Sequence, residues 1–484
     1  MKTRQIICAV MFLGLVATLG WAQGDTSQQP ADSSQQPSTA PAVAFGQNNP
    51  PSAPADNPPI SGLDQPSLEP GITGRSYLIP GLHANQSVDS NVNDNTGSAA
   101  VSGVTRVLGS LTLERLWKSY EVALDYVGGA GFYSNRSNNV SQIHTLGLDD
   151  RILWRTGQLA LRDSFSYLPE GTFGSGSYGG AGALGGTGLG GLGGGGLGGG
   201  IGSGGQGGFF GPGQFASLGQ QSRISNVALV DLTENLSPRT SMTLAGSYGL
   251  VHFNDNTLGF INSRQVAAQA GFNYQLNRKD QVGLLYGFQA FRYPSAIGSD
   301  FNTHVVHVLY GHRISGRMDL VLGAGPQLTD INNVTTGSTQ RISLSGRASL
   351  RYRFPNASVG LYYDHYNSSG SGFFTGATSD VARVSASRPL GRLWTATFDL
   401  GFTHNSKILP SGFGVSAQTY NYLYAGGALR RQLGEYFSAF ISYQFNNLGF
   451  DQSFCGTSTT CNRTSQRNVA TFGLDWHPHP IRLD

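Results

Sequence analysis

Four arginines share one face of a predicted strand at residues 341–353. Successive side chains of a strand point to opposite faces, so arginines at odd-numbered positions project together. Charged side chains that line an enclosed path select ions by sign, so this group predicts a pore wall with a mild preference for anions. The alternative is that the arginines pair with nearby acids and only stiffen the wall. The full set of predicted wall residues is Arg341, Arg347, Arg351, Arg353, Arg383, Asp364 and Asp399.

The histidines form no recognisable catalytic or metal-binding pattern. His304, His307 and His312 cluster on one predicted strand, but only the first and the last share a face. Neither a nucleophile elbow nor zinc-type spacing accompanies them. We therefore expect no enzyme activity, no catalytic residue, no metal site and no cofactor, and we assign these histidines to packing in the wall.

The composition restricts the class of protein. Charged residues make up 12% of the chain, against about 25% in an ordinary soluble domain. Outside the N-terminus no run of about 18 apolar residues occurs, which excludes a helical membrane protein. The 69 glycines, 20 tyrosines and 26 phenylalanines suit β-barrel strands, which need apolar side chains on one face only. A net charge of +3 is too weak to indicate a nucleic-acid partner.

The N-terminal region has the features of an exported protein. Residues 1–22 combine a positively charged start, a short apolar stretch and small residues before a cleavage site after Ala22, as in a secretory signal peptide. Residues 23–72 are rich in Pro, Gln and Ser, and such a segment buries too little surface to offset its chain entropy. We expect these residues to form a disordered linker.

Two cysteines, Cys455 and Cys461, remain after removal of the signal peptide. In an oxidising compartment, two cysteines six residues apart in a Gly/Ser/Thr-rich stretch predict a disulfide that closes a small loop. Two free thiols are the alternative, whereas a metal site would need more ligands than two thiols.

From residue 73 to residue 484, apolar and polar side chains alternate in segments that are typical of strands with two different faces. A soluble sheet with one wet face also alternates, but its strands average only about five or six residues. The longer segments here are sufficient to cross a bilayer at a tilt. The predicted spans are 76–89, 102–114, 119–133, 142–154, 158–168, 221–234, 240–253, 263–276, 281–292, 302–314, 318–330, 340–353, 357–367, 379–388, 392–404, 418–432, 436–446 and 466–477.

The connections between these spans are alternately short and long. Short ones lie, for example, near 235–239 and 354–356, and long ones rich in Asn, Ser, Gly and Thr lie near 368–378 and 447–465. Short periplasmic turns against long outer loops are typical of an outer-membrane barrel. We therefore expect an all-β fold, a transmembrane up-and-down antiparallel β-barrel of about 18 strands (16–18), in the bacterial outer membrane and in contact with its lipid.

The chain resembles a bacterial outer-membrane porin or porin-like barrel over residues 73–484. The last predicted strand, with Phe472, Gly473, Leu474 and Trp476, is similar to the aromatic C-terminal strand that barrel-assembly machinery recognises, although eight more residues follow Trp476. The stretch 87–92 resembles an early strand of porins associated with polysaccharide export. The resemblance implies passive diffusion of small hydrophilic solutes. The alternative that it leaves open is an outer-membrane component of an exopolysaccharide export or assembly system.

The third outer loop, residues 169–220, is the longest and is very rich in glycine. In the porins that the chain resembles, the third loop folds into the lumen and narrows it. Such a loop usually carries acids, but no charged residue occurs here between Glu170 and Arg223. Glycine also makes the loop costly to order, so a mobile outer loop is favoured over a constriction.

Asp150 and Asp163 fall on the apolar faces of two consecutive predicted strands. A turn centred between residues 156 and 157 would place them directly opposite each other. Carboxylates on a lipid-facing surface are destabilising. We therefore expect this hairpin to face another subunit, which makes a homo-oligomer a candidate assembly. A β-bulge that turns both acids inward is the alternative.

Overall fold

The computed structural model describes residues 59–62, 76–92, 96, 100–134, 140–168, 222–254, 260–294, 299–333, 337–354, 357–409, 416–456 and 461–483. No helix within these ranges is long and apolar enough to cross a membrane. The expected signal peptide and the glycine-rich loop 169–220 lie outside the described residues, as does most of the expected linker.

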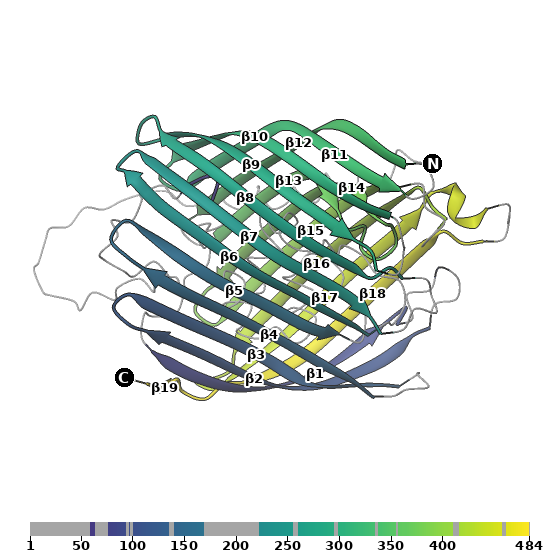
Figure 1. Ribbon diagram of the computed structural model, residues 1–484. Coiled ribbons are helices and arrows are strands. Elements are labelled where there is room, and N and C mark those ends of the chain that lie inside the picture. Colours follow the sequence, from purple (N-terminus) through teal and green to yellow (C-terminus); the bar gives the residue numbers. More distant parts are fainter. Residues whose placement is uncertain are drawn as a thin grey trace, which may run out of the picture. The chain divides into compact units, whose positions relative to one another are not determined.

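Eighteen long antiparallel strands form one sheet in which each strand pairs with its neighbours in the chain (Figure 1). β1 also pairs with β18, which closes the sheet into a barrel. The strands are β1 (Tyr77–Asp89), β2 (Ser102–Leu116), β3 (Tyr120–Tyr133), β4 (Val140–Leu153), β5 (Gly157–Leu168), β6 (Arg223–Ser237), β7 (Thr240–Phe253), β8 (Ser263–Gln275), β9 (Asp280–Arg292), β10 (Ser299–Ser315), β11 (Met318–Asn333), β12 (Gly337–Phe354), β13 (Ala357–Ser368), β14 (Ala377–Leu390), β15 (Trp394–Lys407), β16 (Thr419–Gln432), β17 (Phe437–Phe450) and β18 (Thr464–Trp476).

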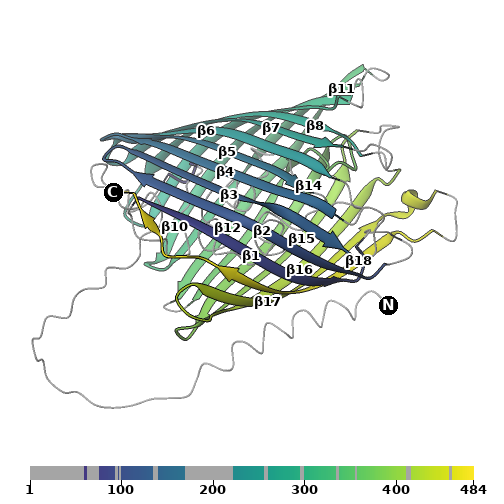
Figure 2. The same cartoon turned by 90° about the horizontal axis from the view of Figure 1, so that it is seen from below.

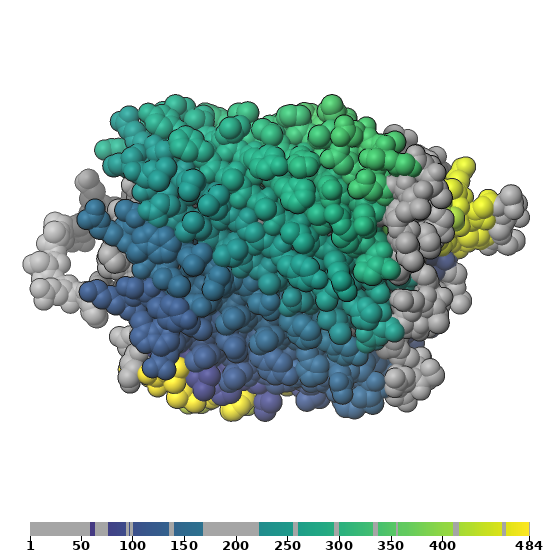
Figure 3. Space-filling view, in the orientation of Figure 1, coloured from purple at the N-terminus to yellow at the C-terminus, as the bar shows by residue number. Residues whose placement is uncertain are grey.

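The two faces of the wall differ in polarity, as β8 illustrates. Gln265, Gln269 and Asn273 are buried on the inner face, while Val266 and Phe272 are 48% and 49% exposed on the outer face. The same alternation continues around the barrel, whose outside is shown over part of its circumference in Figure 3. An apolar exterior around a polar interior is the arrangement of a transmembrane β-barrel, because lipid and not water solvates the outer face.

The prediction of about eighteen strands is confirmed, and among the described connections one differs clearly from the expected pattern. The wall has a turn end with short connections, such as residues 316–317 between β10 and β11, and a loop end with most of the longer ones. A long loop was expected at 331–339, but β11 and β12 continue their pairing to Asn333 and Gly337. Residues 337–342 are exposed at successive positions, which indicates that this hairpin extends beyond the rest of the wall (Figure 2).

The residues after Trp476 take part in closing the barrel. A short strand, β19 (Ile481–Arg482), pairs with Leu78 and Tyr77 at the start of β1, next to the segment of β1 that pairs with β18. At the other end of this seam, Arg467 donates from Nε to Asp89 across 2.8 Å in a buried ion pair. The C-terminal extension therefore lengthens the pairing that seals the wall.

Candidate functional site: the inner wall and its mouth

Three of the predicted wall arginines face acids. Arg383 donates from Nη2 to Asp399 across 2.7 Å, and both side chains are buried. Arg347 lies directly opposite Asp364 in the β12–β13 pairing. Arg351 lies opposite Asp319 on β11, an acid outside the predicted set that also forms an ion pair with Arg313 at 3.3 Å. The arrangement agrees better with mutual neutralisation than with an unbroken positive wall.

The remaining two predicted wall arginines lie toward the ends of β12. Arg341 is near the loop end and Arg353 near the turn end, and both are exposed. The structure therefore does not gather the seven predicted residues into one cluster. It distributes them along the wall, with two of the arginines near its openings.

A buried loop, residues 369–376 between β13 and β14, folds over the inside of the loop end. We call it the mouth loop. Gly370, Ser371, Gly372 and Gly376 have φ values of 81°, 54°, 83° and 90°. These left-handed conformations favour glycine, and they let the short segment reverse direction within the barrel. A Cβ atom on Gly370 would lie only 2.5 Å from the carbonyl oxygen of Phe374.

Phe373 of the mouth loop contacts aromatic side chains from two distant parts of the barrel wall. On one side its ring centroid is 5.8 Å from that of Phe260, which stacks on Phe253 at the end of β7. On the other side it is 5.3 Å from Tyr420 of β16 and 5.5 Å from Phe450 of β17. Edge-to-face and offset pairs of this kind are favourable. Because β7 and β16 are far apart in the ring of strands, these contacts bridge the mouth.

Hydrogen bonds to its main-chain carbonyl groups hold the mouth loop to other loops. The carbonyl of Gly372 accepts from Ile261 N–H at 3.0 Å, and that of Gly376 accepts from Ile408 N–H at 3.1 Å. Tyr293 donates its hydroxyl to the Ser369 carbonyl at 3.2 Å. The loop is thus fixed from several directions across the loop end of the interior.

No predicted site residue lies in the mouth loop. The loop considered as a constriction from the sequence, 169–220, was expected to be a mobile outer loop and lies outside the described residues. A signal was present in residues 368–377, where two phenylalanines stand between glycines and serines in a connection whose other residues are small. Glycine supplies the turns and the aromatic pair supplies the contacts. The tyrosines of β16 gave a second signal, because Tyr420, Tyr422 and Tyr424 place large rings on the inner face.

Asp150 and Asp163 lie on the outer face, as expected, but not directly opposite each other. Asp150 pairs with Leu161 and Asp163 pairs with Leu148, so the two acids are diagonal neighbours and the predicted direct pairing is wrong. The β4–β5 register runs without a bulge. Tyr120 donates to Asp150 at 3.0 Å and Asn226 donates to Asp163 at 3.1 Å. These hydrogen bonds lessen the cost of placing two carboxylates on this surface.

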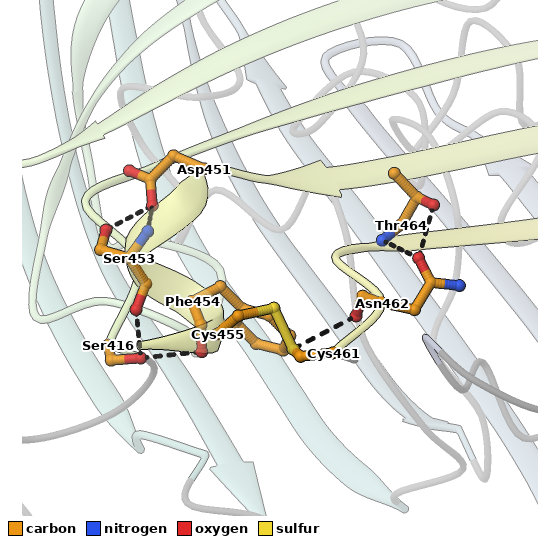
Figure 4. Close-up of a disulfide and its surroundings, with 8 residues drawn as sticks. All are labelled: Ser416, Asp451, Ser453, Phe454, Cys455, Cys461, Asn462 and Thr464. Atoms are coloured by element: carbon orange, nitrogen blue, oxygen red, sulfur yellow. Dashed lines mark hydrogen bonds between the residues drawn. A yellow bond between two sulfur atoms is a disulfide. The ribbon is translucent and has the colours of Figure 1, made fainter. Parts of the chain in front are cut away.

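Cys455 and Cys461 form a disulfide in the connection between β17 and β18 (Figure 4). The short 3₁₀ helix η2 (Gln452–Cys455) precedes it and begins after Asp451. Ser416 donates to the Ser453 carbonyl at 3.0 Å, which ties this loop to the connection between β15 and β16. The disulfide therefore stabilises a small corner of the loop end.

Asp451 is the polar centre of that corner. Its carboxylate accepts the backbone N–H groups of Thr419 at 2.7 Å and Gln418 at 2.9 Å. Partial burial acts to raise the pKa of Asp451, but hydrogen bonds from Ser453 and from these N–H groups outweigh it and hold the pKa below its ordinary value.

The three clustered histidines are parts of the wall. His307 points inward and its Nε2 is 3.0 Å from the Ser345 hydroxyl. His304 and His312 lie on the outer face, within 2.9 Å of Tyr286 and 2.7 Å of Asp280 respectively. Among the described residues, no group of His, Cys, Asp and Glu has the geometry of a metal site.

These features define a transmembrane β-barrel of the outer-membrane, porin-like type. No protein-family model and no curated protein matches the chain. Among solved structures, Pseudomonas aeruginosa OccK2 (OpdF) has a TM-score of 0.40 and 10% identity over 84% of this chain and 98% of its own. P. aeruginosa OpdO scores 0.42 with 10% identity over 83% and 97%, and Acinetobacter baumannii OccAB3 scores 0.40 with 12% identity over 83% and 99%. Because these TM-scores and identities are low, the assignment to the class of outer-membrane barrels rests on the strand order and on the polarity of the two faces of the wall.

Proposed function

We propose that this protein is a channel for passive diffusion of small hydrophilic solutes across the bacterial outer membrane. The observation that carries the proposal is a closed wall of eighteen strands whose inner face is polar. A barrel of about this size leaves an aqueous path unless its interior is filled. Polar side chains on the inside are needed where water and solutes pass, and not where a hydrophobic core is packed.

The mouth loop sets the size limit of the proposed path. Its aromatic bridge from Phe253 to Phe450 crosses the loop end, which faces the cell exterior when short turns face the periplasm. A solute must therefore pass beside this bridge or displace it. This favours a narrow channel over a wide, open pore.

The ion preference is expected to be mild and toward anions. Arg383 is paired with Asp399, and Arg347 lies opposite Asp364. Arg351 and Arg313 share Asp319, so the positive charge of these arginines is offset only in part. Arg341, exposed near the loop end, adds to the remaining positive charge, but salt screens charges that are separated by more than about 8–10 Å.

Planar-bilayer recording of the purified protein tests the proposal. Discrete ohmic steps in KCl are expected, with a reversal potential in a salt gradient that is displaced modestly toward that of chloride. A protein that inserts, as shown by heat-modifiable migration on gels, but never conducts would contradict the channel. It would favour the alternative of an exopolysaccharide export component that opens only with its periplasmic partners.

A further inference from the structure

A four-residue turn from the N-terminal linker lies against the inner wall. Pro59, Ile60, Ser61 and Gly62 form it, and it is closed by a hydrogen bond from Gly62 N–H to the Pro59 carbonyl at 3.0 Å. From the sequence alone, these residues are expected to belong to a disordered linker. At this position the chain is instead held by side chains of β7 to β9 and β12.

Carboxamide groups of the wall accept both backbone donors at the centre of this turn. Ile60 N–H donates to the side-chain oxygen of Gln281 at 2.8 Å. Ser61 N–H donates to the side-chain oxygen of Asn273 at 3.0 Å. A buried N–H group that lacks an acceptor is costly, so each of these two bonds supports the bound position.

Side-chain donors of the wall form hydrogen bonds with the carbonyl groups of Ile60 and Ser61. Gln269 donates from its side-chain amide to the Ser61 carbonyl at 2.8 Å. Arg347 donates from Nη2 to the Ile60 carbonyl at 2.8 Å. Arg347, one of the arginines expected to contribute to ion selection, thus binds peptide backbone.

The side chains of the turn fit equally closely. The Ser61 hydroxyl is 2.6 Å from the Thr243 hydroxyl and accepts from the Asn273 amide at 2.6 Å, and the residue is 0% exposed. Two glycines of the wall make room. A Cβ atom on Gly271 would lie 2.3 Å from the Ser61 Oγ, and one on Gly311 would lie 2.8 Å from the Ile60 Cγ2.

We propose that this patch of the inner wall is a peptide-binding site whose ligand is the chain's own segment 59–62. The site matches every backbone donor and acceptor of Ile60 and Ser61, which a wall that only faced water would not need to do. Because ligand and site belong to one chain, the effective concentration of the segment is high, and about millimolar is typical of tethered ligands. The bound turn occupies part of the interior near the turn end. Its effect on transport rests on the proposed channel function.

Disulfide trapping tests the binding site without reference to transport. The double variant Ser61→Cys/Thr243→Cys brings two sulfur atoms together, and mild oxidation of the full-length mature protein should link them, as shown by non-reducing peptide mapping. Ser61→Cys/Thr471→Cys is the matched control, because Thr471 is also buried on the inner face but lies on β18. Equal linking of the two pairs, or none in the first, would overturn the proposed site.

A pair of glycine variants tests the effect on the path. Gly271→Ala should displace Ser61, whereas Gly246→Ala on β7 meets its nearest atom only at 3.6 Å. In Gly271→Ala we expect disulfide trapping to fall strongly and single-channel conductance to rise about twofold as the path widens. Gly246→Ala should leave both unchanged. If disulfide trapping falls but conductance does not rise, the proposed binding site still stands, but its role in narrowing the path is disproved. If no variant conducts, the channel proposal fails while trapping still decides the site.

Discussion

At the scale of single residues, many polar groups of the interior form hydrogen bonds or ion pairs with one another. Arg383 and Asp399 show this most clearly, because both are buried and the guanidinium reaches one carboxylate oxygen from Nε at 2.9 Å and from Nη2 at 2.7 Å. Pairing a buried charge repays part of its desolvation, whereas removing one partner leaves the other uncompensated. Such pairs make the wall rigid and leave little net charge for ion selection.

Replacing Arg383 by alanine should therefore destabilise the barrel, by about 3 kcal/mol or more in the free energy of unfolding, because Asp399 is left buried without its cation. Urea titration of the protein in detergent micelles, followed by tryptophan fluorescence, measures this. Arg341→Ala is the matched control and should change the free energy by less than about 0.5 kcal/mol, because that residue is exposed near the loop end. Equal effects of the two variants would contradict the buried pair.

Asp451 predicts a pH dependence for the loop corner around the disulfide. Its pKa is lowered in the folded loop, so its contribution to loop stability is complete above the ordinary aspartate pKa of about 4 and is lost as pH falls through the lowered value. Carboxyl-carbon NMR of the protein in micelles should give a midpoint below that of a free aspartate. A midpoint at or above the ordinary value would show that the hydrogen bonds from Gln418 and Thr419 do not hold the carboxylate.

At the scale of elements, a strand ladder and a folded loop perform different tasks. The strands supply a continuous wall, and their hydrogen bonds satisfy the backbone without help from side chains. The mouth loop has no such ladder. It depends on left-handed glycines, on a few bonds to neighbouring loops and on aromatic contacts with β7, β16 and β17.

Truncating the mouth loop's aromatic centre should open the path. In Phe373→Ala the bridge between Phe260 and Tyr420 is lost, and we expect single-channel conductance to increase about twofold because constrictions of apolar side chains limit ion flow. Phe437→Ala is the control, since that ring is exposed at the turn end of β17. Unchanged conductance in Phe373→Ala, with the control also unchanged, would show that the mouth loop does not limit the path.

At the scale of the whole molecule, polarity is inverted relative to a soluble protein. Large apolar side chains such as Val308 and Ile441 are exposed, while Gln, Asn, Ser and Thr line the buried inner face. In water this surface would drive aggregation, and in lipid it is solvated. The inversion makes the energetic effect of a surface charge depend on its depth in the bilayer.

A pair of arginine substitutions on β10 tests that dependence. Val308→Arg, near the middle of the strand, should destabilise the folded barrel by about 2–4 kcal/mol, and Ile314→Arg, near the turn end, by about 0–1 kcal/mol. Reversible unfolding in lipid vesicles measures both free energies of unfolding. Similar values for the two positions would contradict a membrane-spanning orientation of β10.

The sequence by itself determined the wall. The period-two alternation along β8 or β15 and the alternate short and long connections are local signals, so strand bounds such as Thr240–Phe253 follow from nearby residues alone. The inner and outer faces follow as well, because lipid and water impose opposite polarity on adjacent side chains. Mixed faces in 302–314 and 418–432 obscured this pattern, since Leu309 and Tyr420 point inward for packing and not for contact with water.

Only the tertiary structure decided what occupies the interior. The β4–β5 register, the pairing of Arg351 with Asp319, the mouth loop and the bound turn at 59–62 all join residues whose proximity no local pattern encodes. Closing the barrel brings β7 and β16 toward one enclosed space, and contacts across that space depend on side-chain size and on the room that glycines leave. The physical reason is that the wall arises from neighbours in sequence, whereas its contents arise from neighbours in space.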